Sequence, residues 1–327
     1  MKRKLRVAVL YGGRSGEHEV SIRSARSIMA AMDPAKYEIL PLFITKGGRW
    51  KPRPLLPEPG ANRGIDVVFP VLHGTFGEDG TVQGLLELAG LPYVGAGVLG
   101  SSAAMDKEIM KRLCQERSLP VVEYVVMDRA RLSVKLVEER FSYPVFVKPV
   151  NLGSSVGISK PKNRAALRKA LGLAALYDRK VLVERSIAGR ELECSVLGND
   201  DPVASLPCEI IPSREFYDYE DKYILDRAQT IVPADLTPEQ VEETRRLAVA
   251  CYQACACEGM ARVDFLLEAA TGRIYINEIN TIPGFTSISM FPKMWEATGL
   301  AYSRLIDRLI ELALERHAAK RQTRYRR

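Results

Sequence analysis

Three polar side chains that could bind a metal interrupt apolar runs near the C-terminal end, namely Asp264, Glu278 and Asn280. Burying an unpaired carboxylate among apolar neighbours is very unfavourable, so the two acids are expected to meet a cation. Carboxylate and amide oxygens are hard ligands, and they suit magnesium that carries substrate phosphates better than zinc. The alternative is that the acids pair with Arg262 and Arg273 on a half-exposed hairpin.

A predicted hairpin positions these side chains. Apolar strands are expected over residues 261–267 and 273–278, and the Thr271-Gly272 pair between them is a short-loop turn signal. Residues 280–289 follow as a polar segment with proline, glycine and hydroxyl side chains. Polar loops at strand ends are where ligands are usually held, which favours a binding site over a plain surface hairpin.

A second candidate for chemistry is Lys148, at the end of a strand expected over residues 143–148. The Gly/Ser loop 151–157 comes next, and an extended run resumes over residues 158–160. Such a loop offers backbone N–H groups and hydroxyls to an anion, and a lysine ammonium is a natural phosphate contact. No Gly-Lys-Ser/Thr or helix follows, so this is not a Walker A loop, and a flexible hairpin tip is the alternative.

The N-terminal segment contains the next set of candidates. An apolar strand over residues 5–11, a glycine-rich turn and a helix over residues 20–32 predict the opening of an open α/β sheet. The glycines do not fit G-x-G-x-x-G, so a dinucleotide site is not indicated. Glu17 follows the turn and is either a site residue or an acid that favours the helix start.

His73 follows the last of two further strands, which are expected over residues 39–44 and 65–72. The residues after it, 74–80, contain acids and glycines. Ligands in α/β sheets gather at the carboxyl ends of strands, so this exit is a candidate site. The alternative for His73 is a structural histidine with satisfied ring nitrogens. A short strand over residues 91–97 and a helix over residues 101–117 are also expected.

Two lobes are expected to meet near Gly189, which lies between strands over residues 181–184 and 192–197. Free backbone groups at this connection could bind a planar base, and Glu184 or Glu191 could accept from amine or ribose hydroxyl groups. The aromatic and charged segment 212–227 predicts a long surface loop. Other expected elements are a strand over residues 121–127 and helices over residues 164–176, 238–257 and 302–316.

Composition indicates a globular protein of two or three domains, because the chain has 327 residues that are 46% hydrophobic and 27% charged. No apolar run reaches the roughly 18 residues of a membrane span, and the basic N-terminus leads into a short strand rather than a signal peptide. A cytoplasmic protein without a membrane partner is therefore expected. The six cysteines form no CxxC pair, so buried reduced thiols are expected rather than disulfides or a zinc site.

The formal net charge of +7 is concentrated at the C-terminus. Six Lys and Arg lie from Arg316 onward without an acid, and removing them leaves +1 for the rest of the chain. A basic nucleic-acid-binding face is therefore not indicated. A frayed, solvated tail is expected there, with a polyanion contact as the alternative.

In sequence order, GGRSGEHEVS, HGTFGEDG, MDK, VKP, LGSSVG, VERSIAGRE, YDYEDKY, RVDF and NEINTIPGFTSIS resemble the D-alanine:D-alanine ligases of the ATP-grasp superfamily. The resemblance covers about residue 5 to 312. It implies an α/β fold, with an N-terminal open parallel sheet domain (1–103) followed by two α+β ATP-grasp lobes (104–185 and 186–327) that clamp ATP. It also implies ATP-dependent ligation of two D-alanines through D-alanyl phosphate, for peptidoglycan synthesis. The alternatives are another ATP-grasp carboxylate ligase, such as a D-alanine:D-lactate ligase, and a polyanion-binding protein.

The resemblance also implies roles for individual residues around ATP and magnesium, with two metal ions expected and manganese as a substitute. The implied metal ligands are Asp264, Glu278 and Asn280. The implied ATP contacts are Lys107, Lys148 and Lys222 at the phosphates, the Ser154-Ser155 loop over them, Glu184 and backbone through Ile187 at adenine, and Glu191 at ribose.

For the amino acids, the resemblance places the first D-alanine ammonium near Glu17 with His73 close by. Arg262 and the Gly284 N–H are implied to stabilise the tetrahedral oxyanion, and Ser289 and Met290 to hold the second carboxylate. Tyr223 and Ser154, hydrogen-bonded with Glu17, are implied to latch the loop 212–227 as a lid. Tyr223 favours a dipeptide product over a depsipeptide. A homodimer is expected by analogy, with no nucleic-acid partner.

Overall fold

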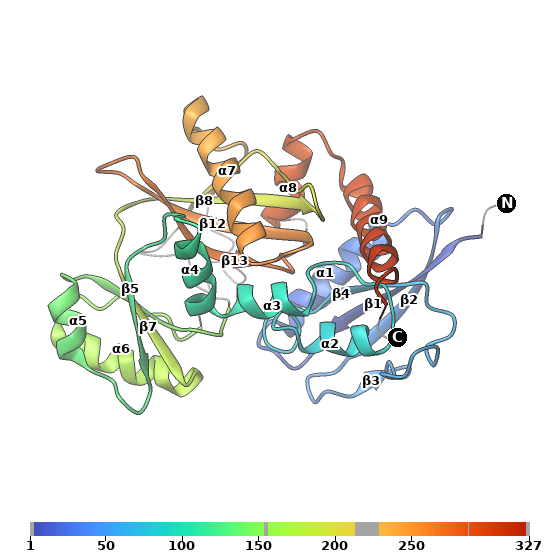
Figure 1. The fold of residues 1–327 in the computed structure, drawn as a ribbon, viewed down its shortest axis with the longest axis horizontal. Coiled ribbons are helices and arrows are strands. Elements are labelled where there is room, and N and C mark those ends of the chain that lie inside the picture. Colours follow the sequence, from blue (N-terminus) through green and yellow to red (C-terminus); the bar gives the residue numbers. More distant parts are fainter. Residues whose placement is uncertain (1–2, 154–155, 213–228, 287, 325–327) are drawn as a thin grey trace.

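Three β-sheets follow one another along the chain in the computed structural model, which describes residues 3–153, 156–212, 229–286 and 288–324 (Figure 1). The first sheet has the strand order β3-β2-β1-β4, and its three long strands are parallel. Its strands are β1 (Leu5–Gly12), β2 (Tyr37–Ile44), the short antiparallel edge strand β3 (Trp50–Lys51) and β4 (Val67–Val71).

Helices cover both faces of this sheet, as parallel strands with continuous apolar runs require. Val7 and Val9 of β1 face helices α1 and α9, whereas Ala8 and Leu10 face the opposite side, where α2 packs. Helix α9 therefore returns from the C-terminal end of the chain to complete the N-terminal core (Figure 1). The helices here are α1 (His18–Ala31), α2 (Thr81–Leu88), α3 (Val98–Met105) and α9 (Tyr302–Lys320).

The strand expected over residues 91–97 is wrong. Only one bridge forms there, between Val68 and Tyr93, and the chain then turns into α3. Gly95 has a φ of 92°, which is outside the range of a strand and ends the extended run. The single helix expected over residues 101–117 is also divided, because Asp106 ends α3 and caps α4 (Lys107–Glu116) by accepting from the Ile109 N–H at 3.0 Å.

The second sheet is antiparallel with the order β5-β7-β6, and one of its faces is covered by α5 and α6. Its core consists of alternate strand residues such as Val147 and Val183, packed on Leu167 and Leu171 of α6. The run expected over residues 158–160 is only a bridge from Val147 to Ser159. The elements are β5 (Tyr124–Asp128), α5 (Val134–Arg140), β6 (Val145–Pro149), α6 (Arg164–Tyr177) and β7 (Lys180–Arg185).

The third sheet has the order β11-β10-β8-β12-β13, with β9 paired to β8. The predicted hairpin is confirmed, and Gly272 in its turn has a φ of 69°. Helices α4 and α7 pack on one face of the sheet. The elements are β8 (Gly189–Gly198), β9 (Val203–Ala204), β10 (Cys208–Ile211), β11 (Gln229–Ile231), α7 (Pro238–Ala254), β12 (Gly259–Glu268), β13 (Ile274–Asn280) and α8 (Met290–Ala297).

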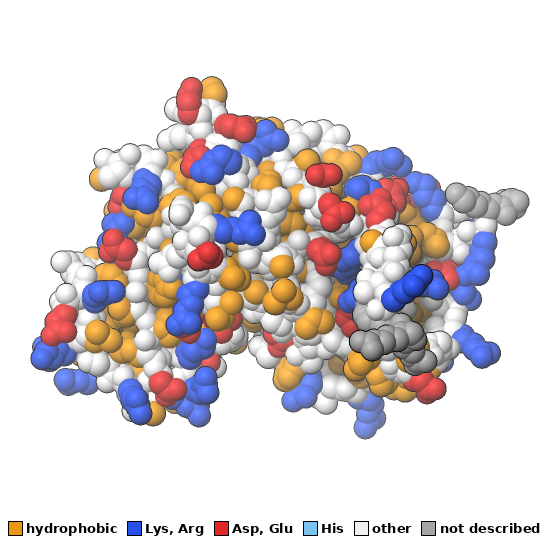
Figure 2. Space-filling model, viewed as in Figure 1, with side chains coloured by type: hydrophobic (Ala, Val, Ile, Leu, Met, Phe, Trp, Pro, Cys, Tyr) orange, Lys and Arg blue, Asp and Glu red, His pale blue; other side chains and the backbone are white. Residues whose placement is uncertain are grey.

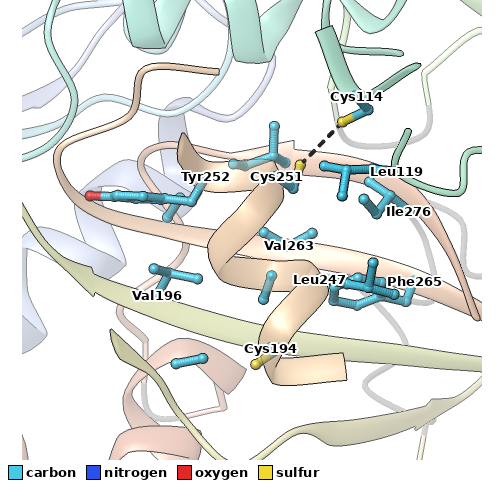
Figure 3. Packing of buried hydrophobic residues seen from close by; sticks show 14 of the residues in the cluster. Cys114, Leu119, Cys194, Val196, Leu247, Cys251, Tyr252, Val263, Phe265 and Ile276 are labelled. Carbon is cyan, nitrogen blue, oxygen red and sulfur yellow. Dashed lines mark hydrogen bonds between the residues drawn. The ribbon is translucent and has the colours of Figure 1, made fainter. Parts of the chain in front are cut away.

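All six cysteines are buried free thiols, as the sequence predicts. Cys114 of α4 and Cys251 of α7 lie with their sulfurs 3.7 Å apart inside the core shown in Figure 3. Because α4 packs in this core, the segment that begins at Lys107 is held against the third sheet.

The expectation of a frayed tail from Arg316 onward is wrong for residues 316–320, which extend α9. The Arg316 guanidinium stacks on the Tyr93 ring at 4.3 Å and donates to the Tyr93 carbonyl at 2.9 Å. Figure 2 shows Lys and Arg interspersed with Asp and Glu on the face it presents. In the described parts of the chain, every helix is too short or too polar to cross a membrane.

Candidate active site

A cleft of about 470 Å³ separates the second sheet from the third. Strands β6 and β7 form one wall, and β8, β10, β12 and β13 form the other. Six of the residues expected at a nucleotide and metal site line this one cleft, five from different strands and Ile187 from the connection between β7 and β8: Lys148, Glu184, Ile187, Glu191, Asp264 and Glu278.

A row of three carboxylates crosses the wall formed by the third sheet. Asp264 of β12 lies opposite Glu193 of β8 on one side and Glu278 of β13 on the other. Like charges directly opposite on neighbouring strands destabilise a sheet, so the row requires cations. Arg262 supplies one, since its Nε lies 2.6 Å from Asp264 Oδ1 and 3.3 Å from Glu193 Oε2.

The Arg262–Asp264 contact is a two-pronged ion pair, with Nη2 2.7 Å from Oδ2. Burial alone lowers the pKa of Arg262, but Asp264 and Glu193 raise it well above its usual value, so the guanidinium is a permanent charge. The alternative interpretation paired the acids with Arg262 and Arg273, and the Arg262 pair is present. Arg273 instead lies over the Tyr275 ring at 5.0 Å.

Buried lysines face the carboxylates. Lys107 Nζ lies 3.6 Å from Glu278 Oε2 and donates to the Leu152 carbonyl at 2.8 Å. Lys148 and Lys111 both pair with Glu184, the latter at 3.1 Å. Burial raises the pKa of Glu184, but the two lysines outweigh that effect and keep its pKa below the usual value. The predicted role of Glu184 toward adenine stays a prediction.

Asn277 is a lining residue that the sequence analysis missed. The register of β12 and β13 shifts between Asp264 and Phe265, which pair with Glu278 and Ile276, so Asn277 is the extra residue of a bulge. Its Oδ1 accepts from Lys148 Nζ at 3.1 Å. Bulges re-aim side chains next to active sites. The signal was present in the sequence, because Asn277 and Glu278 are two consecutive polar residues within a strand of Ile and Tyr.

The residues present fit magnesium. Asn280 lies beside the carboxylate row, where its Nδ2 donates to Asp264 Oδ2 at 3.2 Å. Two carboxylates and an amide are the hard oxygen donors that this ion takes, together with oxygens of bound phosphates. Within the described ranges no cluster of three or more His, Cys, Asp or Glu is arranged as an all-protein metal site.

Glu17 lies at a second location, just before α1. A Cβ on Gly74 would come within 2.7 Å of its Oε2, and a Cβ on Gly153 within 3.6 Å. The Glu17 carboxylate therefore lies between the loop after β4 and the Gly/Ser loop after β6. Glycine is favoured at position 74, where φ is 74°.

His73 is 4% exposed, and both of its ring nitrogens have protein partners. Nδ1 lies 2.9 Å from the Ile282 carbonyl, and Nε2 lies 3.1 Å from Ser24 Oγ. Burial lowers the pKa of His73. The contacts agree with the structural alternative for this histidine. Its predicted closeness to the first D-alanine is not tested by them.

The segment after β13 brings Gly284 next to Ser289. A Cβ on Gly284 would lie 2.7 Å from Ser289 Oγ, which accepts from the Thr286 N–H at 2.9 Å. Ser289 and Met290 occupy the N-terminus of α8. Helix N-termini present N–H groups that favour a carboxylate.

Four of the predicted site residues lie outside the described residues, namely Ser154, Ser155, Lys222 and Tyr223.

Comparisons with known proteins identify the family. The family model "D-ala D-ala ligase C-terminus" matches residues 113–311, and "D-ala D-ala ligase N-terminus" matches residues 6–62 and 54–96. A D-alanine--D-alanine ligase of Solibacter usitatus is 67% identical over 324 residues, which are 99% of this chain and 100% of the relative. One from Caldicellulosiruptor bescii is 49% identical over 358 residues, 98% of each chain.

Solved structures agree with these matches. The D-alanine-D-alanine ligase from Coxiella burnetii has a TM-score of 0.87 at 39% identity, covering 98% of this chain and 96% of its own. The VanG D-Ala:D-Ser ligase from Enterococcus faecalis has a TM-score of 0.87 at 36% identity, covering 95% and 100%. The chain belongs to the D-alanine–D-alanine ligase family, and its fold is the ATP-grasp fold of that family.

Proposed function

We propose that this protein joins two D-alanines into D-alanyl-D-alanine through a D-alanyl phosphate, with cleavage of ATP to ADP and phosphate, for peptidoglycan synthesis. The observation that carries the proposal is that Asp264, Glu278 and the buried Lys148 line one cleft, with the buried Lys107 3.6 Å from Glu278, on a chain of this family. ATP and magnesium are the cosubstrate and the metal of the proposal.

The chemistry explains why these charges are gathered. A free carboxylate does not accept an amine because its leaving group is oxide, so the γ-phosphoryl group must first be moved onto it. That step brings several negative oxygens together, and the protein contributes mainly position and field. We assign Lys107 and Lys148 to the phosphates. Magnesium, when bound by Asp264, Glu278 and Asn280, supplies positive charge that offsets the phosphate oxygens.

The amino-acid end of the site is assigned by similar reasoning. Glu17 offers a carboxylate to the ammonium of the first D-alanine, beside Gly153 of the Gly/Ser loop. The permanent charge of Arg262 and the Gly284 N–H stabilise the oxyanion formed when the second amine attacks. The N-terminus of α8, at Ser289 and Met290, receives the second carboxylate.

The remaining assignments follow the resemblance. Glu184, Ile187 and Glu191 are assigned to adenine and ribose, and Lys222, Ser154 and Ser155 to the phosphates. Tyr223 and Ser154 latch the loop 212–227 as a lid that keeps water from the acyl phosphate. We also propose that the protein is a homodimer and that it lies in the cytoplasm, where ATP is made. Its domain boundaries are placed at residues 103/104 and 185/186.

The direct test incubates the protein with ATP, magnesium and D-alanine and measures phosphate and dipeptide. We expect both, in equal amounts. Competition of D-alanine with D-lactate or D-serine near neutral pH then separates a dipeptide ligase from one with another second substrate. Absence of phosphate release above background with every D-amino and D-hydroxy acid tried rejects the proposal.

A further inference from the structure

The segment that carries Gly284 is held by hydrogen bonds from outside the third sheet. The Ile282 N–H donates to Glu78 Oε1 at 3.1 Å, and the Ile282 carbonyl lies 2.9 Å from His73 Nδ1. The Phe285 N–H donates to Ser24 Oγ at 3.3 Å, and the Phe285 carbonyl accepts from Tyr302 Oη at 3.2 Å. Residues on both sides of Gly284 are thus fixed from the N-terminal α/β domain and from α9, which packs on it.

The direction of these bonds follows from the groups involved. A carbonyl oxygen only accepts, so the His73 proton is on Nδ1 and points at Ile282. Burial lowers the pKa of His73 and keeps the ring neutral, so Nε2 is an acceptor. The Ser24 hydroxyl therefore donates to Nε2, and its oxygen accepts from Phe285. One directed chain runs from the Phe285 N–H through Ser24 and His73 to the Ile282 carbonyl.

Ser24 is the centre of this chain. It is fully buried in α1, on the face that packs toward the C-terminal segment. Removing its hydroxyl leaves the Phe285 N–H and His73 Nε2 without this partner at the same time. An unsatisfied buried polar group costs the full desolvation penalty of that group, so the segment is expected to shift to recover partners.

We propose that Ser24 is a positioning residue for peptide-bond formation, which sets the Gly284 N–H against the oxyanion through His73 and Phe285. The inference rests on the proposed function, and specifically on Gly284 as an oxyanion contact. Phosphoryl transfer occurs at the lysines and carboxylates of the cleft, where Ser24 has no contact. Its loss is therefore expected to slow the second step and to spare the first.

The test compares Ser24→Ala with Ser27→Ala. Ser27 lies one turn further along α1 and contacts Tyr302 Oη at 3.0 Å, but not the Gly284 segment. Tyr302 can still donate to the Phe285 carbonyl without Ser27, so Ser27→Ala leaves the chain through Ser24 and His73 in place. Dipeptide formation measures the whole reaction. Scrambling of an ¹⁸O label between bridging and non-bridging positions of ATP, in the presence of D-alanine, measures reversible formation of D-alanyl phosphate.

We expect Ser24→Ala to lower kcat for dipeptide roughly 100-fold, as small misplacements of a catalytic segment do, with label scrambling and the KM for ATP kept. Ser27→Ala should keep both dipeptide formation and label scrambling near the wild-type values. Equal kcat values for the two variants overturn the inference, as does a Ser24→Ala variant that loses scrambling together with dipeptide formation.

A second variant is used if Ser24→Ala does not fold. Ser24→Cys has a weaker donor and acceptor and should show a smaller drop in kcat that is confined to dipeptide formation. If no such drop is measured, the inference is also overturned. A wild-type protein that makes no dipeptide contradicts the proposed function instead.

Discussion

Asp264 and Glu278 lie directly opposite each other on neighbouring antiparallel strands, and both line the cleft. Two carboxylates in such a position repel, and Arg262 and Lys107 offset the repulsion from the two sides. The arrangement is unfavourable for a sheet whose only task is to be stable. It is what a site for a divalent cation and a polyphosphate requires.

Glu278→Gln tests this pair. The amide keeps the volume of the side chain but removes one negative charge, so magnesium-dependent turnover should be abolished while thermal unfolding stays close to that of the wild type. Phosphate release and the unfolding midpoint are the two measurements, and Glu311→Gln, a surface change on α9, is the control. Unchanged turnover in Glu278→Gln removes this residue from the metal site.

Arg262 is expected to act through its shape as well as its charge. Arg262→Ala should lower turnover by roughly 100-fold or more, as loss of an oxyanion donor does. It should also destabilise the fold by about 3–5 kcal/mol, because Asp264 and Glu193 then remain buried without their cation. Urea unfolding and dipeptide assays measure the two effects.

Arg262→Lys separates the two effects. A lysine supplies a point charge but cannot span both oxygens of Asp264 as the guanidinium does. We expect stability to recover in large part and turnover to stay low. Full turnover in Arg262→Lys contradicts the oxyanion role of the guanidinium.

Glu184 is expected to matter for stability before it matters for nucleotide binding. Its carboxylate is 2% exposed and pairs with Lys111 and Lys148, so Glu184→Gln leaves two buried ammonium groups without their counter-charge. We expect a loss of about 3–5 kcal/mol in the free energy of unfolding. Glu139→Gln removes an exposed partner of Lys135 and should change it by less than about 1 kcal/mol. Equal losses in the two variants contradict the buried-pair interpretation.

Much of the site could be predicted from the sequence because its signals are local. Charged residues in apolar strands, as at Asp264 and Glu278, predict a cation wherever the strands are buried. The Thr271-Gly272 turn predicts the hairpin. The apolar run before Lys148 predicts the strand that carries this lysine. The resemblance then supplied roles that no single motif specifies.

The parts that could not be predicted depend on contacts between distant segments. Ser24 is an ordinary helix residue in the sequence, and its contacts with His73 and Phe285 exist only because α1 packs beside the segment after β13. The sequence places Arg316 in a solvated tail because no local pattern shows that Tyr93 lies beneath it. The position of Asn277 in the cleft depends on the bulge, which shifts the register of two strands by one residue.

Glu78 gives the pH dependence that is easiest to test. Burial, and then the charge of Glu17, raise its pKa to about 8 from an ordinary value of 4.5. Between those two pH values the native protein keeps the proton while the unfolded chain has released it. The unfolded chain thus binds fewer protons, and the contribution of Glu78 to the free energy of unfolding falls as the pH rises toward 8.

Glu78→Gln removes this titration and keeps one oxygen for the N–H groups of Gly74 or Ile282. The stability of the wild type relative to Glu78→Gln should therefore decrease steadily from about pH 5 to about pH 8 and level off above, where the native carboxyl is ionised too. Urea unfolding of both proteins across this range measures the difference, with the surface variant Glu116→Gln as a control that should run parallel to the wild type. A constant difference between the wild type and Glu78→Gln means that Glu78 is already ionised in the native protein at pH 5. The carboxylate then has to be stabilised by its two N–H donors strongly enough to overcome burial beside Glu17.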